Sequence, residues 1–205
     1  MLWTQTMAGL GVGLALASAP GPVQAVLMTE AVRGGLVRGF RAMAGANLTF
    51  GLLLVGLALG LSVAPPGGAA LRILKLAGGV LLVLLAVDGF RTRHEPVGEA
   101  PVHRSLPPAA RGALAVLLNP GAWVFLGTAA SSLLSGATRL GGTGSAVVVA
   151  VALLIGLAVG DGTVVLLGGI GVRRARSNVR AWVRSILAAL LAGLGVWLIV
   201  SGSIS

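Results

Sequence analysis

The stretches Ala19-Pro20-Gly21-Pro22 and Leu118-Asn119-Pro120-Gly121 interrupt two long hydrophobic segments of this chain. A proline inside a helix removes one backbone hydrogen bond and leaves a carbonyl without its partner. Lipid offers no water to such a group, so a broken helix at membrane depth is tolerated only where it faces protein or a wet cavity. The two stretches therefore predict a pair of broken membrane helices whose open backbone groups face the protein interior.

The composition around these stretches is that of a helical membrane protein. The 205 residues are 56% hydrophobic and only 10% charged, and the mean hydropathy is +0.99, whereas a soluble domain has about 25% charged residues. Apolar segments of roughly 20 residues alternate with short polar links, which favours membrane helices over a membrane barrel. The absence of cysteine excludes disulfides and thiolate metal sites. The net charge of +10 is explained by topology rather than by nucleic-acid binding, because the basic residues flank the spans.

Six membrane spans are predicted, and residues 1–205 form one transmembrane domain. Its first half covers residues 1–90, a cytoplasmic loop covers 91–110, and its second half covers 111–205. The first span is expected to be retained rather than cleaved as a secretory signal, because no basic region precedes it and Pro20 would follow the cut. The spans lie near residues 5–29, 41–63, 70–90, 111–134, 145–170 and 182–201.

The basic residues predict the orientation of these spans. Twelve arginines follow spans one, three and five, whereas only Arg72, Lys75 and Arg139 lie on the other side. By the positive-inside rule the twelve are cytoplasmic, and both termini lie outside. Three spans per half then give the halves opposite orientations, which predicts a 3+3 inverted repeat with helices one and four broken. The twelve are Arg33, Arg38, Arg41, Arg91, Arg93, Arg104, Arg111, Arg173, Arg174, Arg176, Arg180 and Arg184.

The two breaks are predicted to lie near the middle of the bilayer. Pro20 is ten residues from Glu30, and Pro120 is nine residues from Arg111, which gives ~15 Å and ~14 Å along a helix in a hydrocarbon core of ~30 Å. Breaks in corresponding positions of two halves point to the binding site of a transporter. For Gln24, Asn47 and Thr49, hydrogen bonding between helices stays open as the alternative role. The candidate substrate-binding residues are Pro20, Gly21, Pro22, Gln24, Asn47, Thr49, Asn119 and Pro120.

Asp161 is the candidate for coupling to a proton or another cation. It lies twelve residues from Arg173, hence ~18 Å from the inner boundary. A carboxylate at that depth costs several kcal/mol unless it is protonated, paired or hydrated, so an intramembrane acid is by default a functional hypothesis. It is predicted either to carry a proton or to pair with an ammonium group of the substrate. Glu30 and Asp88, at span ends beside arginines, are interpreted as interfacial ion pairs.

Several of these motifs together resemble the LysE-type amino-acid exporter superfamily, in particular its threonine and homoserine efflux branch. The resemblance covers nearly the whole chain, and Asp161 falls where many members carry an acid in span five. The chain departs from the family at Val23, where members have asparagine or a small polar residue, at Gly121, where they have lysine, and in having no tyrosine. The matching segments are Ala19-Pro20-Gly21-Pro22 followed by Gly35, Leu74-Lys75-Leu76-Ala77-Gly78, Leu117-Leu118-Asn119-Pro120, and Gly193-x-Gly195.

The resemblance implies a multi-pass protein of the bacterial inner (plasma) membrane that exports amino acids or similar small polar metabolites. The expected driving force is the proton gradient or the membrane potential, and the expected partners are a small amino-acid-like substrate, a coupling ion and the bilayer. A homodimer is left open; no cofactor, no resident metal and no nucleic acid are expected.

Three alternatives to the exporter remain open. A divalent metal-ion exporter on the same fold is disfavoured because the spans contain no Cys or His and only one deep carboxylate. An intramembrane enzyme is disfavoured because Ser131, Ser132 and Asp161 have no visible base partner. A non-transporting membrane subunit would require a purely structural role for every candidate residue.

Overall fold

A computed structural model describes residues 2–19, 21–61, 67–91, 106–174 and 177–204 of the chain. All elements in these ranges are helical. Pro20 and the greater part of the expected cytoplasmic loop, residues 92–105, lie outside the described residues. The elements are α1 (Leu2–Ser18), α2 (Pro22–Ala58), α3 (Gly68–Arg91), α4 (Pro108–Leu117), α5 (Pro120–Phe125), the π-helical turn η1 (Leu126–Ala130), α6 (Ser131–Arg174) and α7 (Ser177–Ile204).

Four helices of the described chain are long and apolar enough to cross a membrane. They cover Pro22–Ala58, Gly68–Arg91, Pro120–Gly171 and Ala181–Ile204. The third has 52 residues, which would measure ~78 Å if it were straight. That is more than twice the ~30 Å hydrocarbon core, so the segment cannot be a single pass.

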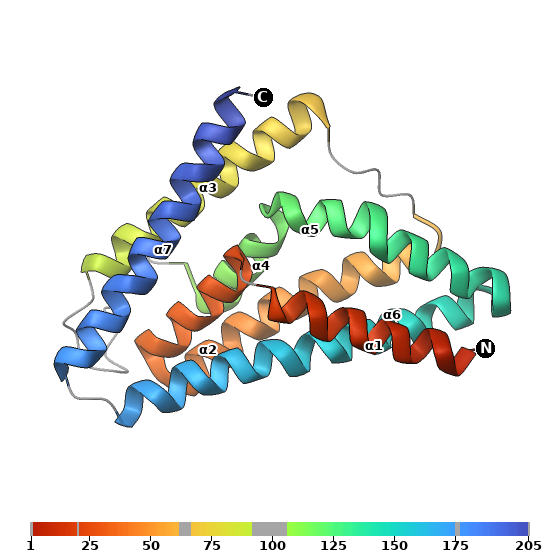
Figure 1. The fold of residues 1–205 in the computed structure, drawn as a ribbon, viewed down its shortest axis with the longest axis horizontal. Helices are drawn as coiled ribbons and strands as arrows, with labels where there is room; N and C mark the ends of the chain where they lie inside the picture. The colour runs from red at the N-terminus through yellow and green to blue at the C-terminus, as the bar shows by residue number, and fades with distance from the viewer. Residues whose placement is uncertain (1, 20, 62–66, 92–105, 175–176, 205) are drawn as a thin grey trace.

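Glycine turns divide the two longest helices. Gly35 inside α2 has φ 72 and ψ −168, and Gly142 inside α6 has φ 71 and ψ −171. A residue with a side chain rarely adopts such a positive φ, so glycine is what the reversal requires. Figure 1 shows the chain turning back at both places, at opposite ends of the molecule.

The turn at Gly35 corrects the sequence-based expectation for the first cytoplasmic connection. We expected a loop carrying Arg33, Arg38 and Arg41 before a second span at 41–63. Instead, all three arginines are helical, and the helix after Gly35 ends at Ala58. A loop is unnecessary because the positive φ of Gly35 reverses the chain within one residue. Arg33 and Arg38 then pair with acids within the protein.

Small residues set the packing of the helices. Gly13 of α1 lies against the backbone of Leu153 in α6, and Gly156 of α6 lies against the backbone of Leu10, so that neither glycine leaves room for a Cβ. A comparable close approach joins Gly79 of α3 to Gly195 of α7. Between membrane helices, where lipid is as apolar as leucine, such close backbone contact is a principal source of association.

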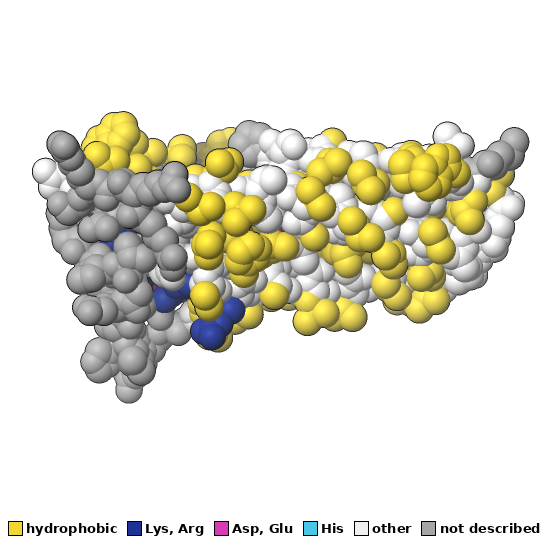
Figure 2. Space-filling model, turned by 90° about the horizontal axis from the view of Figure 1, so that it is seen from below, with side chains coloured by type: hydrophobic (Ala, Val, Ile, Leu, Met, Phe, Trp, Pro, Cys, Tyr) yellow, Lys and Arg dark blue, Asp and Glu magenta, His cyan; other side chains and the backbone are white. Residues whose placement is uncertain are grey.

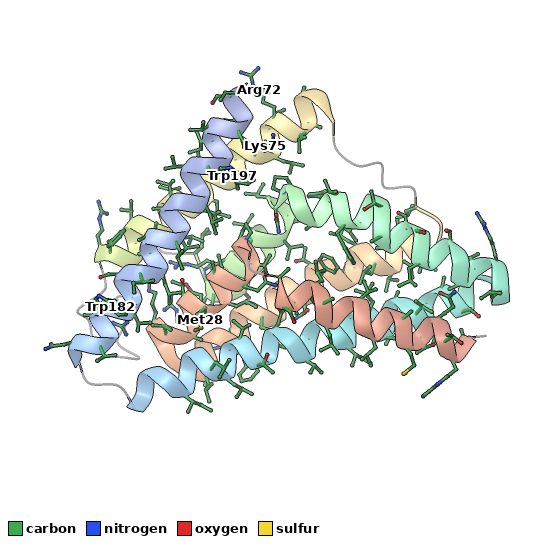
Figure 3. All side chains as sticks on the ribbon, viewed as in Figure 1. Met28, Arg72, Lys75, Trp182 and Trp197 are labelled. Atoms are coloured by element: carbon green, nitrogen blue, oxygen red, sulfur yellow. The ribbon has the colours of Figure 1, made fainter. Side chains whose placement is uncertain are left out.

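The helices form two groups that diverge from one end of the molecule. In Figure 1 the α3–α7 pair points away from the group formed by α1, α2, α5 and α6. The turn inside α2, the end of α3, the end of α6 and the beginning of α7 lie at the shared end, and the beginning of α1 and the end of α7 lie away from it. Figure 3 places Trp182 near that end of α7, whereas Trp197 lies further along α7 toward Arg72 and Lys75.

The surface matches a lipid environment. Leu48, Leu52, Leu167 and Trp197 are each more than 60% exposed. Figure 2 shows a long face whose described part is covered by hydrophobic side chains, other uncharged side chains and backbone, while the visible Lys and Arg atoms lie near one end. With its apolar helices, the chain is therefore an all-helical, multi-pass membrane protein.

Candidate functional site

The first interruption lies between α1 and α2. The helix α1 ends at Ser18, and α2 begins at Pro22 with Gly21 extended as its N-cap residue (φ −163, ψ −178). Proline at the first helical position has no amide hydrogen to leave unsatisfied, which explains why a helix starts here. The Ala25 amide donates to the Gly21 carbonyl at 3.0 Å. The amides of Val23 and Gln24 precede this first helical bond and therefore lack an acceptor within the helix.

The second interruption lies between α4 and α5 and is built differently. Asn119 caps α5 with its own side chain, whose Oδ1 accepts a hydrogen bond from the Gly121 amide at 3.0 Å. The side-chain Nδ2 of Asn119 remains as a donor. Trp123 Nε1 donates to the carbonyl of Leu117 at 2.7 Å and so satisfies one acceptor at the end of α4. We expected free carbonyls at this break, but the Leu117 carbonyl is hydrogen-bonded by Trp123. The sequence did not indicate this role of Trp123.

A cavity of about 240 Å³ lies between the two interruptions, and we call it the central cavity. Residues of both breaks, of α2 and of α6 form its walls. Thr49 and Pro120 are not among the lining residues. Thr49 Oγ1 donates instead to the carbonyl of Gly45 at 2.8 Å. The predicted site residues that do line it are Gly21, Pro22, Gln24, Asn47, Asn119 and Asp161.

The helical repeat explains which side chains share this cavity. Asn47 and Thr49 are two residues apart and therefore project about 200° from one another around α2. Phe50, three residues after Asn47, lies on the same face and lines the cavity, as does Leu157, four residues before Asp161. Sequence reasoning missed both, although their spacing from the polar residues contained the signal.

Asp161 is the buried acid of the central cavity. Its exposed fraction is 1%, and Asn47 Nδ2 donates to its Oδ2 at 3.2 Å. Asp161 Oδ1 and Asn47 Oδ1 have no hydrogen-bond partner. No described arginine or lysine forms an ion pair with Asp161. These two oxygen atoms can therefore accept hydrogen bonds from a cation that carries donors, and the carboxylate can accept a proton.

A second group of charged side chains lies where α2, α3 and α4 contact one another. Arg111 donates from Nη1 to Glu30 Oε1 at 2.8 Å and from Nη2 to Asp88 Oδ2 at 2.6 Å. Arg38 Nε lies 2.5 Å from Glu30 Oε2, and Arg33 Nη1 lies 2.8 Å from Asp88 Oδ2. We name these five residues the arginine cluster.

The two acids of the arginine cluster form the ion pairs that the sequence predicted, and the structure shows how deeply these pairs lie within the protein. Both acids are ion-paired, as expected, but Glu30 is only 1% exposed and Arg111 only 2%. Only the Asp88 side chain, at 30%, is substantially accessible. The cluster is therefore a buried contact between three helices, because three guanidinium groups offset the cost of burying two carboxylates.

The described residues contain no group of three or more His, Asp or Glu side chains that could hold a metal ion. The chemistry that the central cavity offers is hydrogen bonding and one negative charge. Such a site can bind a small polar molecule that carries hydrogen-bond donors.

Comparison with known proteins gives one match. A family model described as LysE type translocator matches residues 14–202. No curated protein and no solved structure matches the chain.

Proposed function

The chain belongs to the LysE type translocator family, a family of membrane exporters of amino acids or similar substrates, and from that premise we propose a specific transport function. We propose that it is a secondary transporter of the bacterial inner (plasma) membrane that exports amino acids or similar small polar metabolites. The proton gradient or the membrane potential drives this export. The substrate binds in the central cavity, and alternating access exposes that cavity to each side in turn.

The proposed architecture is a six-span, 3+3 inverted repeat with both termini outside. The lengths of the segments beside the breaks support it. On the proposed outer side, the helical segments 2–18 and 120–140 have similar lengths. On the proposed inner side, the shorter segments 22–34 and 108–117 also have similar lengths. The long segment precedes the break in the first half and follows it in the second, which fits two broken helices that cross the membrane in opposite directions with their breaks at similar depth.

The positions of the two polar partners support the same arrangement. Asn47 lies twelve residues after the Gly35 turn, and Asp161 lies twelve residues before Arg173. Both are therefore ~18 Å from the proposed cytoplasmic ends of their helices. Their hydrogen bond joins the two halves at that shared depth.

In the proposed binding mode, Asp161 receives the ammonium group of the substrate or the counter-transported proton. Asn47 holds the carboxylate of Asp161 in place through its Nδ2. The first-turn amides of α2 and Nδ2 of Asn119 face the carboxylate end of a zwitterion, because a helix N-terminus favours a negative group. The observation that carries the proposal is a buried acid that pairs with no described arginine or lysine, in a cavity between two helix breaks.

The test is substrate flux in vesicles that contain only this chain. Vesicles are loaded with a mixture of amino acids, and the loss of each is measured by mass spectrometry. The parent chain is expected to release at least one amino acid saturably, whereas Asp161→Asn reduces that flux by about tenfold or more, equivalent to at least 1.4 kcal/mol of lost interaction.

Thr49→Val is the matched control, because Thr49 is a polar residue of the same helices that does not line the central cavity. It is expected to retain the parent flux. Full proton-coupled flux in Asp161→Asn would remove the role given to this residue. Absence of any saturable flux from the parent chain would favour a non-transporting subunit.

A further inference from the structure

A second, wider cavity of about 610 Å³ lies between the end of α2 and the beginning of α6. We call it the wide cavity. One wall is the end of α2 together with the turn that follows it, residues 57–61, and is largely apolar. The opposite wall carries Ser131, Ser135, Thr138 and Arg139. Figure 1 shows these segments near the end of the molecule that carries the N-terminus.

The hydroxyl groups of this wall are oriented as acceptors. Ser131 Oγ donates to the carbonyl of Leu126 at 2.7 Å, Ser135 Oγ to that of Ser132 at 3.0 Å, and Thr138 Oγ1 to that of Leu134 at 2.9 Å. Each hydroxyl hydrogen is therefore used within the helix. The oxygen lone pairs are left for a donor, and an ammonium group, which has three donors and no acceptor, suits them.

Arg139 gives the same wall a positive charge. It is exposed and forms no salt bridge with any acid of the described chain. A guanidinium group binds a carboxylate through two parallel hydrogen bonds. Acceptor oxygens and a guanidinium on one wall together match the two ends of a zwitterion.

Two aromatic rings stand between the wide cavity and the central cavity. Along α2, Asn47 and Phe50 line the central cavity, whereas Leu57 lines the wide one. Along the facing segment, Ala122 lines the central cavity and Gly127 the wide one, so Phe125 falls between them in sequence. The ring centroids of Phe50 and Phe125 are 6.0 Å apart, with planes tilted by 38°.

We propose that the wide cavity is a second substrate site, an exit vestibule in which Arg139 holds the substrate carboxylate and the hydroxyl oxygens of α6 hold its ammonium group. The Phe50–Phe125 pair separates this vestibule from the central cavity. The proposal rests on the proposed function for the substrate class and for the outward direction of this end. The π-helical turn η1 begins directly after Phe125, and such turns are often found at functional sites.

The absence of cysteine from the chain makes a direct test available. Ser135→Cys places one thiol in the wide cavity, and the same thiol in an Arg139→Gln background is the matched control. Each purified variant, reconstituted in vesicles, is treated with an anionic and with a cationic membrane-impermeant methanethiosulfonate reagent. Relative to the control, the thiol at 135 is expected to favour the anionic reagent by about fivefold, because a guanidinium lies close by. Arg139→Lys is expected to keep most of that preference.

Substrate recognition is tested by protection of the same thiol. A mixture of neutral L-amino acids is expected to slow modification at 135, whereas the corresponding amino-acid amides, which lack the carboxylate, are not. Equal protection by acids and amides, or a charge preference that persists in Arg139→Gln, would overturn the vestibule. These readouts need no transport, so a failure of flux and a failure of the vestibule are separate results.

The aromatic barrier is tested at Ala122, which is 5% exposed on the central-cavity side of Phe125. The thiol of Ala122→Cys is expected to react about tenfold or more slowly than that of Ser135→Cys, as a burial cost of 1.4 kcal/mol or more implies. Adding Phe125→Ala is expected to remove most of that difference in variants that elute as a single species. Equal reactivity of the two thiols with both rings present would show that the pair is no barrier.

Discussion

Glu30 and Asp161 are equally buried, at 1% exposure each, yet their surroundings differ. Glu30 receives guanidinium groups from Arg38 and Arg111, one on each carboxylate oxygen. Asp161 receives one amide hydrogen from Asn47 and has one oxygen without a partner. Burial alone therefore does not distinguish the two acids, whereas their partners do.

The difference has a physical meaning for stability and for transport. A buried charge is costly unless a counter-charge and hydrogen bonds replace its lost hydration. Around Glu30 the protein supplies both, and the result is a fixed contact between helices. Around Asp161 the protein supplies one hydrogen bond and no described counter-charge. A cation or a proton that enters the cavity can therefore interact favourably with this carboxylate. The incomplete site is the one suited to a ligand that comes and goes.

Glu30→Gln is expected to give the largest effect within this comparison. It removes the counter-charge that the buried Arg111 shares with the partly buried Arg38, which lowers the free energy of unfolding by about 3 kcal/mol. Thermal unfolding of the purified protein in detergent measures this. Asp161→Asn in the same assay is the control and is expected to unfold no earlier than the parent, because it removes a charge that no cation balances. A Glu30→Gln protein as stable as the parent would break the comparison.

Asn47→Ala tests the surroundings of Asp161 and is expected to give a smaller effect. It removes the one hydrogen bond that orients Asp161, and a bond to a charged group contributes about 1.5–3 kcal/mol. We expect the apparent substrate affinity to fall by about tenfold at the lower end of that range. Concentration dependence of flux in vesicles measures it. Thr49→Ala, on the same helix, is expected to leave the affinity unchanged, and an equal loss in both variants would contradict the role of Asn47.

Asp88→Asn is expected to give the smallest effect. It tests whether the more exposed ion pairs of the arginine cluster contribute less to stability than the buried ones. The Asp88 side chain is 30% exposed, and Arg111 keeps Glu30 as its counter-charge when Asp88 is neutral. We expect a loss of about 1 kcal/mol in unfolding free energy, in keeping with partly exposed ion pairs. The same thermal assay applies. A loss equal to that of Glu30→Gln would mean that burial does not set the strength of these pairs.

Local chemistry made much of this organisation predictable. Composition and apolar run length predicted a multi-pass helical protein, and the matching family model bears out the resemblance to LysE-type exporters. The prolines marked where α2 and α5 begin, because proline fits the first turn of a helix and disrupts its interior. Counting residues along the helix predicted that Asp161 lies well inside an apolar segment, and the structure has this side chain buried.

Other features depended on contacts that no local pattern reports. The Gly35 turn was missed because many glycines in the chain are packing contacts, and only the backbone angle distinguishes a turn from a contact. Trp123 of α5 donates a hydrogen bond to Leu117 of α4. Arg111 forms ion pairs with Glu30 and Asp88, which belong to two other helices. No pattern within one segment predicts such contacts.

The sequence by itself determined that this chain is a helical membrane protein and that α2 and α5 begin at prolines, because hydrophobic length and proline act locally. Only the tertiary structure decided that Asn47, and not Thr49, meets Asp161, and that arginines surround Glu30 but not Asp161. The reason is that pairing depends on which helix faces approach one another. That choice is made by close packing across the whole molecule rather than within any one segment.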